Sequence, residues 1–110
     1  MKKDPQTFIK HILESIEWIE KDIANLTEEQ FKQNVPIQDA VMRRLEIIGE
    51  AIRNLPGDFK DQHPEISWDK PMAMRNLLIH NYFGVDLNIV WDTATQTLPE
   101  FKKQIIQLLT

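Results

Sequence analysis

Apolar residues recur every three or four positions along most of the chain, and this spacing constrains the fold more than any other feature of the sequence. A helix with one face in a protein core has this period, whereas a half-buried strand alternates between apolar and polar at every second residue. No segment of the sequence shows the alternation of a strand. The pattern therefore predicts an all-α protein.

The first part of the sequence predicts a long helix followed by a short one. Asp4 is an N-cap, Pro5 is tolerated in a first helical turn, and the apolar pattern that follows continues to Leu26. Thr27 and Gln30 form a capping box, a pairing that marks the start of a helix. We therefore expect a second, short helix to begin here.

Prolines and a glycine mark the expected helix boundaries in the next part of the chain. The short helix is expected to stop before Val35-Pro36. A second long helix has apolar residues from Ile37 to Leu55 and ends at the breaker pair Pro56-Gly57. Residues 58–67 are mostly polar and contain a proline, which is typical of a connector with room for one turn of helix.

Two further helices are predicted in the second half. The third begins at residues 67–69 and ends near Phe83-Gly84, where the glycine suits the left-handed position that follows a helix. Asp86 caps a fourth helix, which Pro99 either kinks or restarts. The tryptophans are expected to be core aromatics: Trp18, Trp68 and Trp91.

These helices predict an up-and-down bundle of four main helices plus short helices, in a single domain of residues 1–110. The 17 Asp and Glu residues outnumber the 13 Lys and Arg residues, giving a net charge of −4. This balance excludes a uniformly basic protein that coats nucleic acid but permits a local basic site. Without cysteine, signal peptide pattern or membrane span, the chain is expected to be soluble and cytoplasmic, with no membrane partner.

Most catalytic motifs are absent from the sequence. The glycines are too far apart for a loop that cradles phosphate, and the histidines lack the spacings of helical metal ligands. His11 and His63 are expected at the surface. Glu46 and Glu50 lie four residues apart on one helix face, a spacing more typical of solvated side chains than of a metal site. We therefore expect neither a metal nor a cofactor.

The third predicted helix carries polar residues among apolar ones: Arg75, His80 and Tyr82. Charged side chains without partners are costly to bury, so these residues are expected to face a cleft or a partner. At about 100° per residue, Arg75 and Tyr82 fall on nearly one face. His80 lies about 140° from Arg75 and about 7.5 Å along the axis, a gap that the long arginine side chain can bridge.

A guanidinium and an imidazole without a metal suit cleavage of a phosphodiester through the ribose 2′-hydroxyl. One group moves the proton, and the other stabilises charge that develops on the phosphate. The spacing alone also fits a structural ion pair and an ordinary interior histidine. These residues by themselves therefore leave a ribonuclease and a purely structural bundle as alternatives.

The extended sequence around these residues resembles the HepT-like proteins of the HEPN superfamily. The segment RNLLIHNY, residues 75–82, fits their R-x4-H-x-Y motif, including a polar residue, Asn76, after the arginine. Residues 44–51, RLEIIGEA, resemble the family's R-L-E-x-I-G-E-A helix. Further matches flank the motif: Trp68, the FGVD of residues 83–86, Val90-Trp91 and Leu98-Pro99. The resemblance covers the chain from about Arg43 onward, with a compatible first helix.

This resemblance implies a helical toxin of a toxin–antitoxin system. Such proteins are metal-independent endoribonucleases that use the motif arginine and histidine, here Arg75 and His80, with Asn76 in support. They form homodimers that bring two motifs to one cleft, and cleavage leaves a 2′,3′-cyclic phosphate. The implied partner is an MntA-type nucleotidyltransferase antitoxin, which transfers AMP from ATP to the motif tyrosine, here Tyr82, and thereby blocks RNA binding.

Within this interpretation, His80 is expected to act as general acid or base, because only histidine titrates near neutrality without help. Arg75 is expected to bind the scissile phosphate. RNA binding by an acidic protein requires basic residues near the cleft, and the candidates are Arg43, Arg44, Arg53, Lys70 and Arg75. The alternative function is a non-catalytic helical module that binds a nucleotide or a nucleotidyltransferase.

Overall fold

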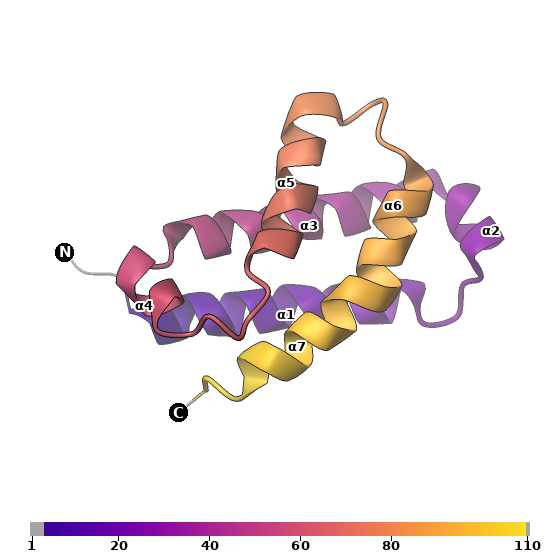
Figure 1. Cartoon of the computed structure of the whole chain (residues 1–110). Helices are drawn as coiled ribbons and strands as arrows, with labels where there is room; N and C mark the ends of the chain where they lie inside the picture. Colours follow the sequence, from indigo (N-terminus) through magenta and orange to yellow (C-terminus); the bar gives the residue numbers. More distant parts are fainter. Residues whose placement is uncertain (1–3, 110) are drawn as a thin grey trace.

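The computed structural model describes residues 4–109, and helices form all of the regular secondary structure in this part of the chain. The two longest helices, α1 (Pro5–Ile23) and α3 (Val35–Asn54), lie side by side and run in opposite directions (Figure 1). The short helix α2 (Glu28–Lys32) lies where the chain turns from one to the other. The all-α helical bundle predicted from the sequence is confirmed.

Side-chain caps begin these helices where the sequence predicts them. The Asp4 carboxylate accepts a hydrogen bond from the backbone N–H of Gln6, at 3.0 Å. Thr27 and Gln30 form the reciprocal capping box, with bonds of 3.1 and 3.0 Å. The first helix nevertheless ends at Ile23, earlier than the apolar pattern to Leu26 suggested. A turn follows the helix, closed by the Leu26 N–H donating to the Ile23 carbonyl, and Leu26 is half-buried there.

The core lies between α1 and α3 and extends to the C-terminal helices. Its largest fully buried side chains are Phe31, Phe101, Ile9, Ile12, Ile16, Ile19, Leu45, Ile48, Ile52, Leu78, Leu98 and Ile105. Each such side chain contributes roughly 1.5 to 3 kcal/mol by leaving water. The three- to four-residue spacing on α1 and α3 therefore accounts for the packing of these two helices against each other.

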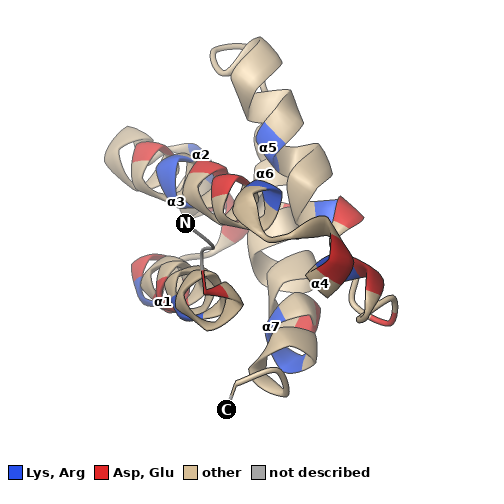
Figure 2. Cartoon of the chain, turned by 90° about the vertical axis from the view of Figure 1, so that its left-hand side faces the viewer, with Lys and Arg blue, Asp and Glu red and all other residues tan. Residues whose placement is uncertain are grey.

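The connector after α3 contains the expected turn of helix, α4 (Gly57–Asp61). It leads to α5 (Asp69–Asn81), which packs mainly on α3, crosses it steeply and extends beyond it (Figures 1 and 2). The side chains that α5 buries are Pro71, Met74 and Leu78. In Figure 2 the outer end of α5 shows no Lys, Arg, Asp or Glu, and the sequence has none of these four residue types from position 76 to 85.

The prediction of a left-handed glycine after this helix is wrong. Among residues 4–109 no glycine has a positive φ, and the C-cap Tyr82 stays in the right-handed helical region. Gly84 is instead pressed against Asn81, because a Cβ at residue 84 would lie 2.6 Å from the Asn81 Oδ1. A larger residue at position 84 would therefore require the exposed Asn81 side chain to move, whereas the backbone conformation at this position does not require glycine.

The last part of the chain is one continuous helical rod of three segments. Asp86 caps α6 (Leu87–Asp92) as expected, a π-helical turn η1 (Thr93–Thr97) follows, and α7 (Leu98–Ile106) completes the rod. Pro99 lies in the first turn of α7, so it restarts the helix. The wide π turn accommodates a proline that lacks the N–H of a regular helix.

One of the three tryptophans lies outside the core. Trp18 is 44% exposed, and the cationic groups of Lys21 and Arg44 lie 5.0 and 5.6 Å from its ring. The prediction that Trp18 is a core aromatic is therefore wrong, because the cations cover a ring that the helix places at its surface. Trp68 and Trp91 are partly buried and pack against the core. Within residues 4–109, every helix is too short or too polar to cross a membrane.

Candidate active site

Arg75 lies in the middle of α5 and faces α3. Its side chain is only 15% exposed. A Cβ added at Gly49 of α3 would lie 2.2 Å from the Arg75 Cβ and 2.4 Å from its Cγ, which no real pair of atoms tolerates. The aliphatic part of Arg75 therefore lies directly on the α3 backbone, and Gly49 provides the space for it.

The guanidinium group of Arg75 is held from two sides. Nη2 donates to the carboxylate of Glu50, the residue next to Gly49, and Nη1 donates to the side-chain oxygen of Asn76 at 3.0 Å. Arg53 approaches the same Glu50 carboxylate at 3.9 Å. The Arg75 Nε is buried and has no hydrogen-bond partner among the described residues. Arg75 is thus a partly buried cation with a fixed orientation.

Tyr82 also faces α3, one residue beyond the end of α5. Its hydroxyl donates a hydrogen bond of 3.2 Å to the carboxylate of Asp39. Burial and, next in size, the negative charge of Asp39 raise the pKa of Tyr82 above the usual 10.0, because both disfavour the phenolate. The shared face predicted for Arg75 and Tyr82 is confirmed by their contacts with the same helix.

His80 lies on a different side of α5 and is exposed. Its imidazole forms no hydrogen bond or ion pair with the part of the chain that the structure describes, so it is free to meet a ligand. The bonds of the Arg75 guanidinium go to Glu50 and Asn76 instead of toward this imidazole. Within one copy of the chain, Arg75 is anchored and His80 is free.

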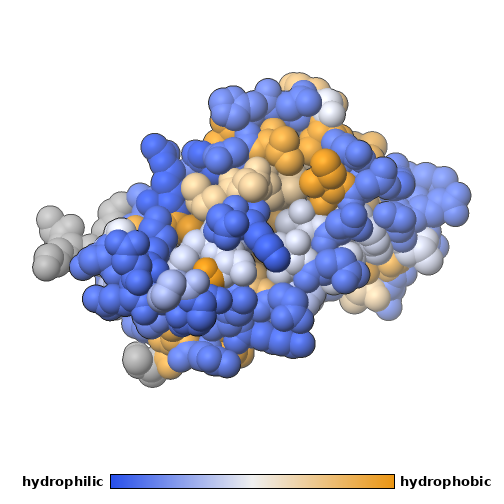
Figure 3. Space-filling model, in the orientation of Figure 1, coloured by the Kyte–Doolittle hydropathy of each residue, from blue (hydrophilic) through white to orange (hydrophobic). Residues whose placement is uncertain are grey.

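Exposed apolar side chains surround His80 on α5 and its C-terminal turn. Leu77 is 44% exposed, Ile79 is 49% exposed and Phe83 is fully exposed. We refer to Leu77, Ile79 and Phe83 as the α5 apolar patch. Figure 3 shows hydrophobic surface over this end of the molecule. A helix that has exposed apolar residues outside the face packed on its own protein is typical of a site of contact with another molecule.

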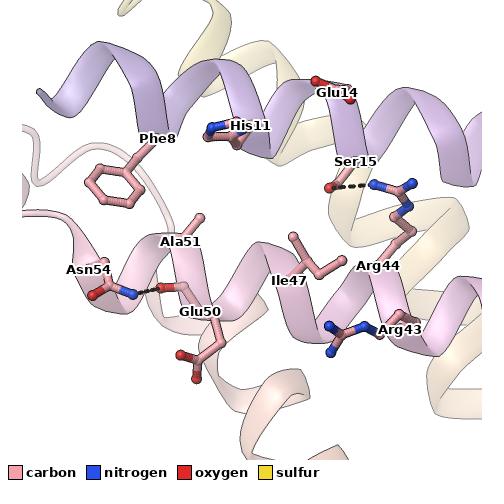
Figure 4. Close-up of a pocket in the computed structure, with 10 residues that line it drawn as sticks. All are labelled: Phe8, His11, Glu14, Ser15, Arg43, Arg44, Ile47, Glu50, Ala51 and Asn54. Atoms are coloured by element: carbon pink, nitrogen blue, oxygen red, sulfur yellow. Dashed lines mark hydrogen bonds between the residues drawn. The ribbon is translucent and has the colours of Figure 1, made fainter.

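The basic residues proposed to gather at the site are only partly gathered. Arg53 lies beside Glu50 and so close to Arg75, whereas Lys70 lines a separate pocket with Thr97 and Glu100. Arg43 and Arg44 line a groove of about 360 Å³ between α1 and α3, which Glu50 also borders (Figure 4).

The side chains of this groove point in different directions. Arg44 points toward α1, where its Nη1 lies 3.5 Å from the Ser15 hydroxyl, while Arg43 and Glu50 point away from α1 (Figure 4). Exposed His11 lies at the groove on the α1 side, whereas His63 is half-buried and its Nδ1 lies 3.4 Å from Glu65. The Glu50 carboxylate therefore lies on the side of α3 that faces α5 and points away from the groove.

Three residues of this site were not identified from sequence as functional: Gly49, Glu50 and Asp39. The four-residue spacing of Glu46 and Glu50 predicts solvated side chains, yet the Glu50 carboxylate binds Arg75, which lies 25 residues later in the sequence. The sequence feature that could have identified them is the Gly-Glu pair within RLEIIGEA, since a glycine in a helix permits close approach of another helix. Helical spacing does not say which helix crosses there. Among residues 4–109, no three His, Asp or Glu side chains are grouped so that they could hold a metal ion.

Comparison with known proteins relates nearly the whole chain to one family. The family model described as Ribonuclease HepT-like matches residues 12–108. A protein of Methanocaldococcus jannaschii named "Gamma-glutamylcyclotransferase and putative RNase" is 44% identical over 99% of this chain, which spans only 49% of that longer protein. The "Probable ribonuclease HepT" of Thermococcus cleftensis is 43% identical over 98% of both chains. A "Putative RNase" of Caldanaerobacter subterraneus subsp. tengcongensis is 37% identical over 97% of this chain and 96% of its own. No solved structure matches.

Proposed function

Because this chain belongs to the ribonuclease HepT-like family, we propose that it is an endoribonuclease with Arg75 and His80 as its catalytic residues. The observation that carries the proposal is that one helix presents an anchored guanidinium and, a turn and a half later, an exposed imidazole without a partner. An oriented cation and a titratable group are the two elements that metal-free RNA cleavage requires.

In the proposed reaction, the ribose 2′-oxygen attacks the adjacent phosphorus while His80 takes its proton. The 5′-oxygen leaves and takes a proton from the solvent, to which His80 later returns its own, so the products are a 2′,3′-cyclic phosphate and a 5′-hydroxyl. Arg75 binds the phosphate oxygens and stabilises the negative charge that builds up on them. Asn76 supports the reaction by bonding the Arg75 Nη1. No metal ion takes part in any step.

The test is an RNA cleavage assay in EDTA with the variants Arg75→Ala and His80→Ala. We expect each variant to lose about 100-fold or more of the cleavage rate, because each removes a group that acts in the transition state. His11→Ala is the matched control, since it removes an exposed histidine from α1. Unchanged cleavage by both α5 variants, or no cleavage of any RNA by the folded wild type, contradicts the proposal. The second result, with retained binding of a nucleotidyltransferase, favours a non-catalytic module.

We further propose that the active form is a homodimer joined through the α5 apolar patch. Support comes from the exposure of Leu77, Ile79 and Phe83 and from the absence of charged residues between positions 76 and 85. Pairing two α5 helices covers this apolar surface and gathers two anchored arginines and two free histidines around one cleft. Acid–base and phosphate-binding roles can then be shared between the two copies.

Light scattering tests the homodimer. The wild type is expected at twice the 13.0 kDa mass of the chain, and Ile79→Lys is expected at the mass of one chain, because a charge in the apolar contact is costly. Gln107→Lys is the control for added charge, because Gln107 is exposed at the end of α7, away from the outer end of α5 (Figure 1). A monomeric wild type that cleaves RNA at full rate contradicts this part of the proposal.

The proposed biological role is that of a toxin silenced by an MntA-type nucleotidyltransferase antitoxin. The Tyr82 oxygen attacks the α-phosphorus of ATP, pyrophosphate leaves, and the phenolic proton passes to Asp39, to which it is already hydrogen-bonded. The attached AMP adds bulk and negative charge on the Arg75 face of α5, which opposes RNA binding. Intact mass after incubation with ATP and the partner should rise by one AMP. Tyr82→Phe should prevent this, since Tyr82 is the only tyrosine.

A further inference from the structure

We propose that Glu50 is a positioning residue that fixes the Arg75 guanidinium for phosphate binding. The proposal rests on the proposed function, because it concerns the arginine that meets the RNA. It assigns a role to a carboxylate on α3 that contacts neither the scissile bond nor His80. Three features of the structure support it: the position of the Arg75 stem, the contacts of its guanidinium and the surroundings of Glu50.

The stem of Arg75 has little freedom before it reaches Glu50. Its Cβ and Cγ lie against the backbone at Gly49, where even one added carbon would overlap them. A side chain held this closely at its base directs its guanidinium to a small region. Glu50, the next residue of α3, presents its carboxylate in that region. Gly49 thus determines where the aliphatic part of Arg75 lies, and the adjacent Glu50 determines the position of its guanidinium.

The contacts leave suitable donors for a phosphate. A guanidinium has five N–H groups, of which Glu50 takes one on Nη2 and Asn76 takes one on Nη1. The Nε–H is buried. One N–H therefore remains on each Nη nitrogen, and a pair of this kind is what a phosphate accepts from arginine in a two-pronged contact. Glu50 orients Arg75 without occupying all of its donors.

Because Glu50 is partly exposed, its main effect on Arg75 is to orient the guanidinium rather than to neutralise its positive charge. Its side chain is 45% exposed, and Arg53 lies 3.9 Å from the same carboxylate. Water and a second cation therefore weaken the hold of Glu50 on the charge of Arg75. The direction of the guanidinium is retained, since it is set by hydrogen bonds of fixed geometry. Loss of Glu50 is thus expected to change the direction of the Arg75 guanidinium more than its positive charge.

Glu50→Ala and Glu50→Gln test the role when kcat and KM for RNA cleavage are measured separately. Glu50→Ala should lower kcat by about tenfold to a hundredfold, because misplacing a group by about 1 Å has effects of this size. KM should change much less than kcat, because a less well oriented phosphate contact and the removal of a negative charge near the RNA have opposite effects on binding. Glu50→Gln keeps an oxygen that accepts the Nη2 hydrogen bond, so it should recover most of the lost kcat.

Glu20→Ala is the matched control for these variants. Glu20 is 43% exposed and pairs with Lys102 at 2.9 Å, so its removal breaks an ion pair of similar exposure between α1 and α7. It should leave kcat unchanged. If Glu20→Ala lowers kcat as much as Glu50→Ala does, or if Glu50→Ala is as active as the wild type, the positioning role is overturned.

A second measurement is independent of RNA cleavage. The Nε–H signal of Arg75 in nitrogen NMR relaxation should show a rigid side chain in the wild type and a mobile one in Glu50→Ala, with exposed Arg43 as the mobile reference. An Arg75 that is equally rigid in both proteins overturns the inference. If Arg75 is rigid in the wild type and mobile in Glu50→Ala but the wild type does not cleave RNA, the proposed function is contradicted while Glu50 remains the residue that fixes the Arg75 side chain.

Discussion

The paired helices α1 and α3 and the outer half of α5 use apolar residues in opposite ways. On α1 and α3 the large apolar residues gather on one face, and most of them are buried there. On α5 only Pro71, Met74 and Leu78 are buried, while the apolar patch stays exposed. The packing of a single chain therefore explains the first pattern and leaves the second unexplained. The comparison indicates that the outer half of α5 is shaped for contact with another molecule.

The largest expected difference between the two regions is in the free energy of unfolding. Ile48→Ala on α3 should lower it by about 2 to 5 kcal/mol, because the isoleucine is fully buried and leaves a cavity. Ile79→Ala makes the same chemical change on α5, where the side chain is 49% exposed, and should shift the value by about 0.5 kcal/mol or less. Urea unfolding of both variants at low protein concentration measures the difference.

Raising the protein concentration sharpens the same experiment. If α5 pairs with a second copy, Ile79→Ala becomes more destabilising as the concentration rises, because dimer formation stabilises the folded state by mass action. Ile48→Ala should show no added dependence beyond that of the wild type. Equal losses for the two variants at low concentration would mean that the outer half of α5 belongs to the core.

The next effect concerns the crossing of α3 and α5. Gly49→Ala should destabilise the protein by about 1 to 3 kcal/mol, because the new carbon overlaps the Arg75 stem and pushes the two helices apart. Gly57→Ala, at the start of α4, adds a carbon that meets nothing within 4 Å and should be neutral or mildly stabilising. Thermal unfolding of the two variants compares them directly.

RNA cleavage should separate these glycine variants further. Gly49→Ala moves Arg75 itself, so its activity should fall even at a temperature where the protein is fully folded. Gly57→Ala should cleave RNA at the wild-type rate. A fully active Gly49→Ala would show that the crossing tolerates displacement and that the position of Arg75 is not critical.

Sequence spacing predicted the features that depend on neighbouring residues. The capping box of Thr27 and Gln30 is visible in four consecutive letters, and the common face of Arg75 and Tyr82 follows from helical geometry alone. The contact between Glu50 and Arg75 depends on how two helices cross, and the spacing within each helix does not fix that crossing. The exposure of Trp18 was misjudged because its partners, Lys21 and Arg44, cover the ring without burying it.

The smallest expected effect concerns the contact of Tyr82 with α3. Asp39→Asn should lower the pKa of Tyr82, because it removes the negative charge that disfavours the phenolate. Glu46→Gln should lower it less, since Glu46 contributes the smallest of the causes. Tyr82 is the only tyrosine, so the ultraviolet absorbance of tyrosinate during an alkaline titration reports on this residue alone.

Neither substitution should bring the pKa back to 10.0, because burial is the largest cause and both variants retain it. A pKa raised by folding favours the folded state below the unfolded value of 10.0, and this contribution is lost as the pH rises through the folded pKa. Wild-type stability should therefore decline somewhat above pH 10.0, and the part due to Tyr82 should shrink in Asp39→Asn. If that variant titrates as the wild type does, Tyr82 is not held on α3 in solution, and the anchored side of α5 is limited to Arg75.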